Sequence, residues 1–202
     1  MGVGRNCGGT GARTRSPRVA GDVKPSLTER QATMEFCAQS LRTAKTAWPD
    51  TYKTFRDTVG RGFIVEDEPT ATFDFALAGI ALDSQAVWKL FPKEQADRIE
   101  RLIFKCFEST EWEAYAIHEL KEYGDIFQRE VDNISNDGDT VNAIPIRLLH
   151  RLLGDRIRTF YVEMSGTETR YISPVLALMA QDALTPFVGT WKALRDRFDL
   201  LE

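Results

Sequence analysis

The feature that most constrains the fold is a succession of helical patterns that fills the chain from about residue 26 onward. Apolar residues recur there at three- and four-residue spacing, and several prolines stand where a first helical turn tolerates them. Ser173-Pro174 and Thr185-Pro186 each pair a capping residue with a proline, which marks a helix start. These patterns predict helices over 26–48, 51–59, 71–91, 93–108, 110–135, 143–165, 174–184 and 186–199.

Local signals set the expected ends of the first helices. Ser26 and Glu29 have the spacing of a capping box, and Pro49 is expected to separate the first helix from the second. The strand-like run GFIVEDEPT is short and isolated, so we interpret it as a linker. The sequence therefore predicts an all-α bundle of about seven or eight helices, formed by a single domain over residues 26–202.

Two segments of the predicted helices, 73–82 within 71–91 and the whole of 174–184, are apolar on nearly every side. Such a helix has to be covered on every side, and both are too short to cross a membrane. Each is therefore expected at the centre of the bundle or at a subunit seam. From this we predict that the C-terminal pair of helices, over 174–199, helps to form a homodimer.

The first 25 residues have a different composition from the rest. They contain six glycines, five basic residues and one acidic residue, and little that could be buried. We expect residues 1–25 to form a disordered basic tail. A plain flexible tail or a start that is not the native one is the favoured explanation, and an organelle transit peptide or a nucleic-acid-binding arm are the alternatives.

Charge and cysteine content narrow the classes of function. Beyond residue 25 the chain has 21 basic and 29 acidic residues, which disfavours nucleic acid and anionic membranes as partners. Cys7, Cys37 and Cys106 are odd in number and form no C-x-x-C motif, which argues against a disulfide framework or a zinc knuckle. We expect a cytoplasmic protein. Cys37 and Cys106 fall among apolar neighbours and are predicted to be buried, inert thiols.

The best candidate for chemistry is the segment EWEAYAIHEL within the predicted helix 110–135. Glu111, Tyr115, His118 and Glu122 share one helical stripe, and this stripe is expected to lie nearly opposite the apolar one. Glu111, His118 and Glu122 are thus the candidate metal ligands. The chain lacks the Glu-x-x-His and His-Glu-x-x-His spacings of known metal helices, so we favour a solvated face and expect no cofactor.

The predicted helix 143–165 raises two further questions. His150 falls on its apolar side, which favours a hydrogen-bonded core residue over a catalyst. Arg147, Arg151 and Arg158 line another side, where they form a candidate docking face for an acidic partner or a phosphate. Ion pairs between these arginines and the acid-rich helix 110–135 are the interpretation that we favour.

Three hypotheses for function remain open at this stage. The first is a non-enzymatic interaction or accessory protein that presents helix faces to a protein partner or to its own copy. The second is an enzyme, or a ligand- or metal-binding bundle, with its site near Glu111, Tyr115, His118 and Glu122. The third is a regulator that contacts nucleic acid through the helix 143–165 and the basic tail.

Overall fold

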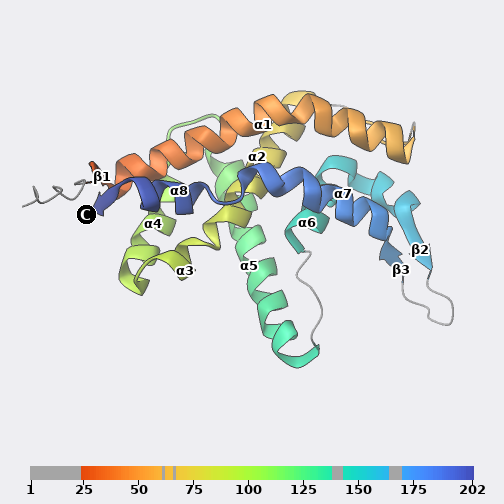
Figure 1. Ribbon diagram of the computed structural model, residues 1–202. Helices are drawn as coiled ribbons and strands as arrows, with labels where there is room; N and C mark the ends of the chain where they lie inside the picture. Colours follow the sequence, from red (N-terminus) through yellow and green to blue (C-terminus); the bar gives the residue numbers. More distant parts are fainter. Residues whose placement is uncertain (1–23, 61, 66, 138–142, 164–169) are drawn as a thin grey trace, which may run out of the picture.

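The computed structural model describes residues 24–60, 62–65, 67–137, 143–163 and 170–202, and no side-chain detail for 130–137, 163, 170 and 171 (Figure 1). Nearly all of the tail predicted at 1–25 lies outside these ranges. The α-helices are α1 (Glu29–Val59), α2 (Glu68–Ser84), α3 (Val87–Leu90), α4 (Lys93–Lys105), α5 (Glu113–Asp137), α6 (Ala143–Leu153), α7 (Pro174–Leu184) and α8 (Thr190–Arg197). Two 3-10 helices, η1 (Gly154–Phe160) and η2 (Thr185–Phe187), follow α6 and α7. The prediction of an all-α fold is confirmed.

The first helix is longer than the sequence predicts, because α1 continues through Pro49 to Val59. A proline inside a helix removes one backbone hydrogen bond and crowds the preceding turn. Aromatic packing on both sides of the proline offsets this cost. Trp48 packs 5.7 Å from the Phe75 ring, and Phe55 stacks 4.7 Å from Phe63, with all four rings buried. The predicted break between 48 and 51 is therefore wrong.

The start of α1 also differs from the prediction. The capping residue is Thr28, whose hydroxyl accepts a hydrogen bond from the Gln31 backbone N–H at 3.2 Å. The Gln31 side chain accepts in return from the Thr28 backbone N–H at 3.0 Å. The capping box is thus Thr28 with Gln31 in place of Ser26 with Glu29, because residues 26–28 form a short strand, β1 (Ser26–Thr28).

The apolar segment 73–82 lies in α2, at the centre of the bundle. Phe75, Leu77 and Ile80 have no exposed surface, and α2 packs against α1, α5, α6 and α7. Gly79 allows the ring of Phe187 to approach so closely that a Cβ atom at this position would lie 2.2 Å from the ring. The expectation that this helix is covered on every side is confirmed.

The C-terminal segment runs back along α1, so that the last residues lie beside the first described ones (Figure 1). Strand β4 (Asp199–Leu201) pairs in parallel with β1. Asp83, at the end of α2, accepts hydrogen bonds from the backbone N–H groups of Gly189 at 2.7 Å and Trp191 at 3.0 Å. This buried carboxylate therefore caps the N-terminus of α8 and fixes it against α2.

The predicted helix 143–165 is the least accurate of the predicted segments. Its α-helical part ends at Leu153, and Gly154 follows with φ of 52°. The chain continues as η1 and then as strand β2 (Tyr161–Glu163), which pairs antiparallel with β3 (Arg170–Ile172). Glycine adopts this left-handed conformation at little cost, which explains where α6 stops. The linker interpretation of GFIVEDEPT is confirmed for residues 62–65, which are neither helix nor strand, but it is wrong for residues 68–70, which form the first turn of α2.

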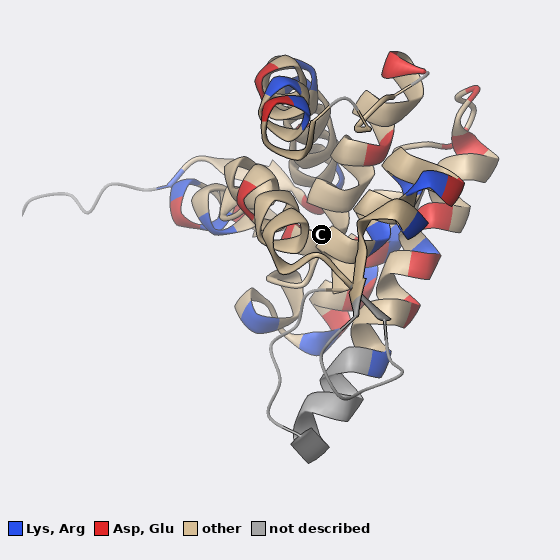
Figure 2. Cartoon of the chain, turned by 90° about the vertical axis from the view of Figure 1, so that its right-hand side faces the viewer, with Lys and Arg blue, Asp and Glu red and all other residues tan. Residues whose placement is uncertain are grey.

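The outer surface of the bundle carries both signs of charge. Acidic and basic residues are interspersed over the helices in Figure 2. None of the helices within the described ranges combines the length and apolar character that spanning a lipid bilayer would require.

Candidate functional site

The four residues of the predicted stripe on α5 do not meet at one site. Glu111 lies before α5 and accepts a hydrogen bond from its neighbour, the Trp112 indole N–H, at 3.1 Å. The His118 side chain is 66% exposed, whereas Tyr115 turns inward and packs against the hydrophobic core. The described residues contain no group of three or more histidine, cysteine, aspartate or glutamate side chains arranged to hold a metal ion.

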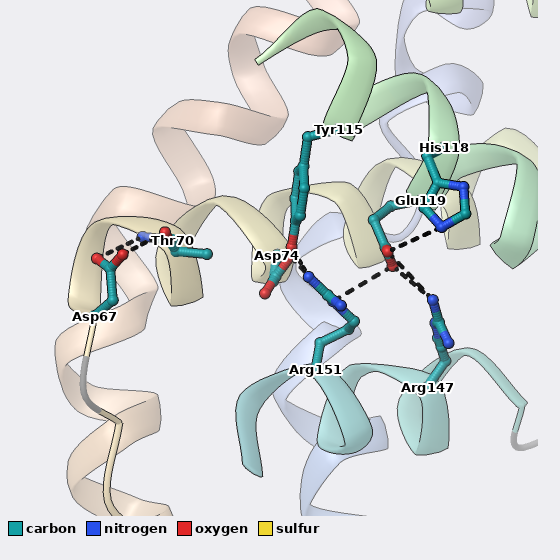
Figure 3. A network of polar contacts seen from close by, with 8 residues as sticks. All are labelled: Asp67, Thr70, Asp74, Tyr115, His118, Glu119, Arg147 and Arg151. Atoms are coloured by element: carbon teal, nitrogen blue, oxygen red, sulfur yellow. Dashed lines mark hydrogen bonds and ion pairs between the residues drawn. The ribbon is translucent and has the colours of Figure 1, made fainter. Parts of the chain in front are cut away.

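The prediction that this stripe lies opposite the apolar side of α5 is wrong for Tyr115, because α2 and α6 cover that side. The Tyr115 hydroxyl donates a hydrogen bond to the Asp74 carboxylate on α2 and accepts one from the Arg151 guanidinium on α6 (Figure 3). The Arg151 guanidinium also lies over the Tyr115 ring, 5.1 Å from its centre. Tyr115 thus bridges three helices.

A second buried carboxylate, Glu119, completes this network one turn further along α5. The Arg147 Nη2 atom lies 3.2 Å from one Glu119 carboxylate oxygen and 3.1 Å from the other. The Arg151 Nε atom lies 3.5 Å from Glu119 and 3.9 Å from Asp74, and the His118 Nε2 atom lies 3.9 Å from Glu119 (Figure 3). Two carboxylates therefore face two guanidiniums, so the charges balance without a ligand.

Burial controls the acid–base behaviour of the network. It raises the pKa of Asp74 to about 6, since a carboxylate loses its hydration there and the nearby Glu119 charge repels it. The hydrogen bond from Tyr115 and the charge of Arg151 oppose this rise. Burial, followed by the hydrogen bond to Asp74, raises the pKa of the Tyr115 hydroxyl. An open pocket of about 420 Å³ borders Asp74 and Arg151, but their charges are already paired within the protein.

The three arginines predicted as a docking face have different environments. Arg147 and Arg151 form ion pairs with Glu119 on α5, which is the favoured interpretation of the sequence. The Arg158 side chain is 84% exposed and lies 4.0 Å from Asp155. A docking role therefore stays a prediction, and Arg158 is the arginine of this set whose charged group faces solvent.

His150 is half-buried on α6, and its Nε2 atom lies 3.4 Å from the Tyr161 hydroxyl. Burial, followed by the charge of Arg147, lowers the pKa of this imidazole. The histidine is thus a hydrogen-bonded residue at the edge of the core, close to its predicted role.

A cleft lined largely by apolar residues lies elsewhere, between α1, the start of α2 and the end of α4. Its volume is about 650 Å³. The lining residues are Arg30, Met34, Cys37, Ala38, Leu41, Phe73, Leu102, Lys105, Cys106, Phe107, Glu108, Thr110 and Trp112. We call this space the thiol cleft, because two of its lining residues are cysteines.

The lining of the thiol cleft includes both exposed aliphatic side chains and packed aromatic rings. Met34 and Leu41 on α1 are 55% and 39% exposed. The lining also includes a cluster of aromatic rings, in which Phe73 packs 4.8 Å from Trp112 and 6.0 Å from Phe107 between ring centres. The cleft therefore offers apolar surface that the described residues leave uncovered.

Sequence reasoning missed both the buried carboxylates and the thiol cleft. Glu119 has a recognisable signal, since it shares the helical stripe of the buried residues Ala116, Leu120 and Tyr123. Asp74 has one too, as a lone acid within the apolar run 71–82. The cleft has no such signal, because its walls come from three helices and a turn that meet through tertiary packing.

Comparisons with known proteins identify no relative of the chain. The chain matches no protein-family description, no curated protein and no solved structure. The geometry of the network and of the thiol cleft is therefore the basis for the functional argument.

Proposed function

We propose that the chain is a non-enzymatic binding protein and that the thiol cleft holds a small, largely apolar ligand. The observation that carries this proposal is the cleft itself, whose lining combines exposed Met34 and Leu41 with a cluster of aromatic rings. Its volume of about 650 Å³ falls within the roughly 300–1,000 Å³ of typical small-molecule sites. Exposed apolar surface of this kind is a favourable binding surface, because a ligand removes it from water.

Charged groups on the lining point to the polar end of such a ligand. Arg30 and Lys105 are exposed lining residues, against the single acid Glu108. This excess of positive charge favours an anionic group, such as a carboxylate or sulfonate, attached to an apolar body. The buried Asp74–Glu119 network offers no comparable site, since each of its charges already has a partner.

Two fluorescent probes of similar ring size test the proposal, namely anionic 8-anilinonaphthalene-1-sulfonate and neutral N-phenyl-1-naphthylamine. Both should bind the folded protein with one site per chain. Ala38→Trp should abolish both by filling the cleft, whereas the double variant Arg30→Gln/Lys105→Gln should weaken the anionic probe by about tenfold and spare the neutral one.

Val175→Ser is the matched control, since it removes an exposed apolar side chain from α7, outside the cleft. Circular dichroism checks that each variant is folded. Probe binding that survives Ala38→Trp but falls in Val175→Ser would refute the thiol cleft as the site and point to α7.

We infer a second binding role, self-association, from the outward side of α7 and η2. Val175, Leu178 and Val188 are 58%, 59% and 61% exposed. The exposed residues of this stretch, which we call the α7 face, are Pro174, Val175, Leu178, Gln181, Asp182, Thr185, Pro186 and Val188. A two-fold interface brings identical patches together, and a face with one charged residue in eight has little like-charge repulsion to overcome. This supports the homodimer predicted through 174–199.

A further inference from the structure

Two thiols from distant parts of the chain meet in the thiol cleft. Cys37 lies on α1 and is 4% exposed, and Cys106 caps the end of α4 and is half-buried. Both line the cleft, where α1 packs against α4, and each thiol affects the pKa of the other. Small molecules that enter the cleft therefore meet two thiols on the same lining.

The environments of the two thiols differ in a way that assigns different chemistry to each. The hydrogen bond from Cys37 lowers the pKa of the Cys106 thiol, and the Arg30 charge acts in the same direction against the opposing effect of burial. The same hydrogen bond, together with burial, raises the pKa of Cys37. Cys106 is also the more accessible thiol, half-buried against 4% exposure for Cys37, and because the thiolate is the reactive form we assign Cys106 as the nucleophile of the pair.

We propose that Cys106 and Cys37 form a peroxide-sensitive dithiol, in which Cys106 attacks a hydroperoxide and Cys37 then closes an intramolecular disulfide. The inference rests on the position of both thiols in one cleft between packed helices, and it goes beyond ligand binding. It also departs from the prediction of two buried, inert thiols, which was based on their apolar neighbours.

The reaction needs a hydroperoxide, ROOH, as its oxidant. The Cys106 thiolate attacks one peroxide oxygen, so that an S–O bond forms, the O–O bond breaks and RO⁻ leaves to take up a proton as ROH. Cys37 then attacks the Cys106 sulfur, the S–S bond forms, the S–O bond breaks and hydroxide leaves as water with the Cys37 proton. In total, two thiols and ROOH give one disulfide, ROH and H₂O.

This chemistry would join α1 to the end of α4 across the lining of the cleft. The two sulfurs have to approach to the ~2.05 Å of a disulfide bond. Residues 106–112 form a turn between α4 and α5, so a small shift there is the simplest way to bring Cys106 to Cys37. The disulfide would consequently alter the cleft that holds the proposed ligand.

The test uses full-length protein with Cys7→Ser, which leaves Cys37 and Cys106 as the cysteines present. One equivalent of hydrogen peroxide should lower the intact mass by the two hydrogens lost, without forming a covalent dimer, and peptide mapping should find 37 linked to 106. Persistent sulfinic or sulfonic acid at Cys106 with both thiols otherwise unlinked would overturn the proposal.

Single variants assign the order of events. In Cys37→Ser, peroxide should leave a sulfenic acid at Cys106 that dimedone traps, whereas in Cys106→Ser the Cys37 thiol should stay reduced. If either variant fails to fold, iodoacetamide labelling of the unmodified pair at pH 7 gives the same information. Cys106 should react at least roughly tenfold faster than Cys37, and the difference should vanish in denaturant. Faster reaction at Cys37 would reverse the assignment and refute it.

Discussion

Neutralising Glu119 is the most direct perturbation of the buried charge network. Glu119→Gln keeps the shape of the side chain but removes the charge that faces Arg147 at 3.1 Å and Arg151 at 3.5 Å. Two guanidiniums would then face the single carboxylate of Asp74. The folded state should lose stability, because the unfolded chain solvates both arginines equally well in either variant.

The size of the expected stability loss depends on how deeply Glu119 and its two arginine partners are buried. Removing one partner of a fully buried ion pair costs about 3–5 kcal/mol. The Glu119 side chain is 2% exposed, but those of Arg147 and Arg151 are 25% and 32% exposed, so water screens part of the uncompensated charge. The amide that replaces the carboxylate in Glu119→Gln can also still accept one hydrogen bond. We therefore expect a loss of about 2–4 kcal/mol in the free energy of unfolding.

Urea denaturation followed by tryptophan fluorescence measures this loss at pH 7. Glu122→Gln is the matched control on the same helix, and it should change the free energy of unfolding by less than about 0.5 kcal/mol. Adding Arg147→Met to Glu119→Gln should recover part of the loss, because it removes one of the unpaired cations. Equal stability of Glu119→Gln and the control would show that the network contributes nothing as a set of charges.

Two further predictions concern acid–base linkage and association. The pKa of Asp74 is about 6 in the folded protein and near 3.8 when exposed, so the folded state holds this proton more tightly and stability falls as pH rises from about 4 to 6. This fall should amount to about 3 kcal/mol in the free energy of unfolding. Urea titrations from pH 4 to 7 should not find it in Asp74→Asn, and the same pH dependence in wild type and variant would contradict the prediction. On the α7 face, Leu178→Glu should convert a dimer to a folded monomer in light scattering after size exclusion, with Ile64→Glu, at an exposed apolar residue outside this face, as the control. A wild-type monomer of 22.9 kDa at micromolar concentration would refute the dimer.

The fold was largely predictable from sequence where the signals are local. Helical periodicity, prolines in first turns and the uniformly apolar segment 73–82 each depend on neighbouring residues, and they gave the correct fold class and the central helix. The errors arise where distant contacts decide. Aromatic packing carries α1 through Pro49, and β1 exists because it pairs with residues near the other end of the chain.

The difference between local signals and contacts of distant residues also explains which features of the functional sites could be predicted. The stripe on α5 was correctly identified as polar, but the partners of Tyr115 are on α2 and α6, 41 and 36 residues away. A helical wheel shows which side chains share a face and gives no account of what covers that face. Cys37 and Cys106 likewise look isolated in the sequence, because their shared place in the thiol cleft depends on how α1 packs against α4.

Two glycines test how far local sequence signals decide stability, since helix propensity predicts the same effect of an alanine substitution at either position. Alanine is about 1 kcal/mol more favourable than glycine within a helix, so Gly79→Ala on α2 and Gly124→Ala on α5 should both stabilise the protein if propensity decides. A Cβ at 124 meets no atom within 4 Å, and that variant should gain about 1 kcal/mol. A Cβ at 79 would lie 2.2 Å from the Phe187 ring, which is 1% exposed and packs edge-on against Phe75. Displacing that ring should outweigh the propensity gain and leave Gly79→Ala less stable by about 1–3 kcal/mol in urea denaturation. If both variants were stabilised equally, the close packing of α2 against η2 would be wrong, and with it the basis for placing 73–82 at the centre of the bundle.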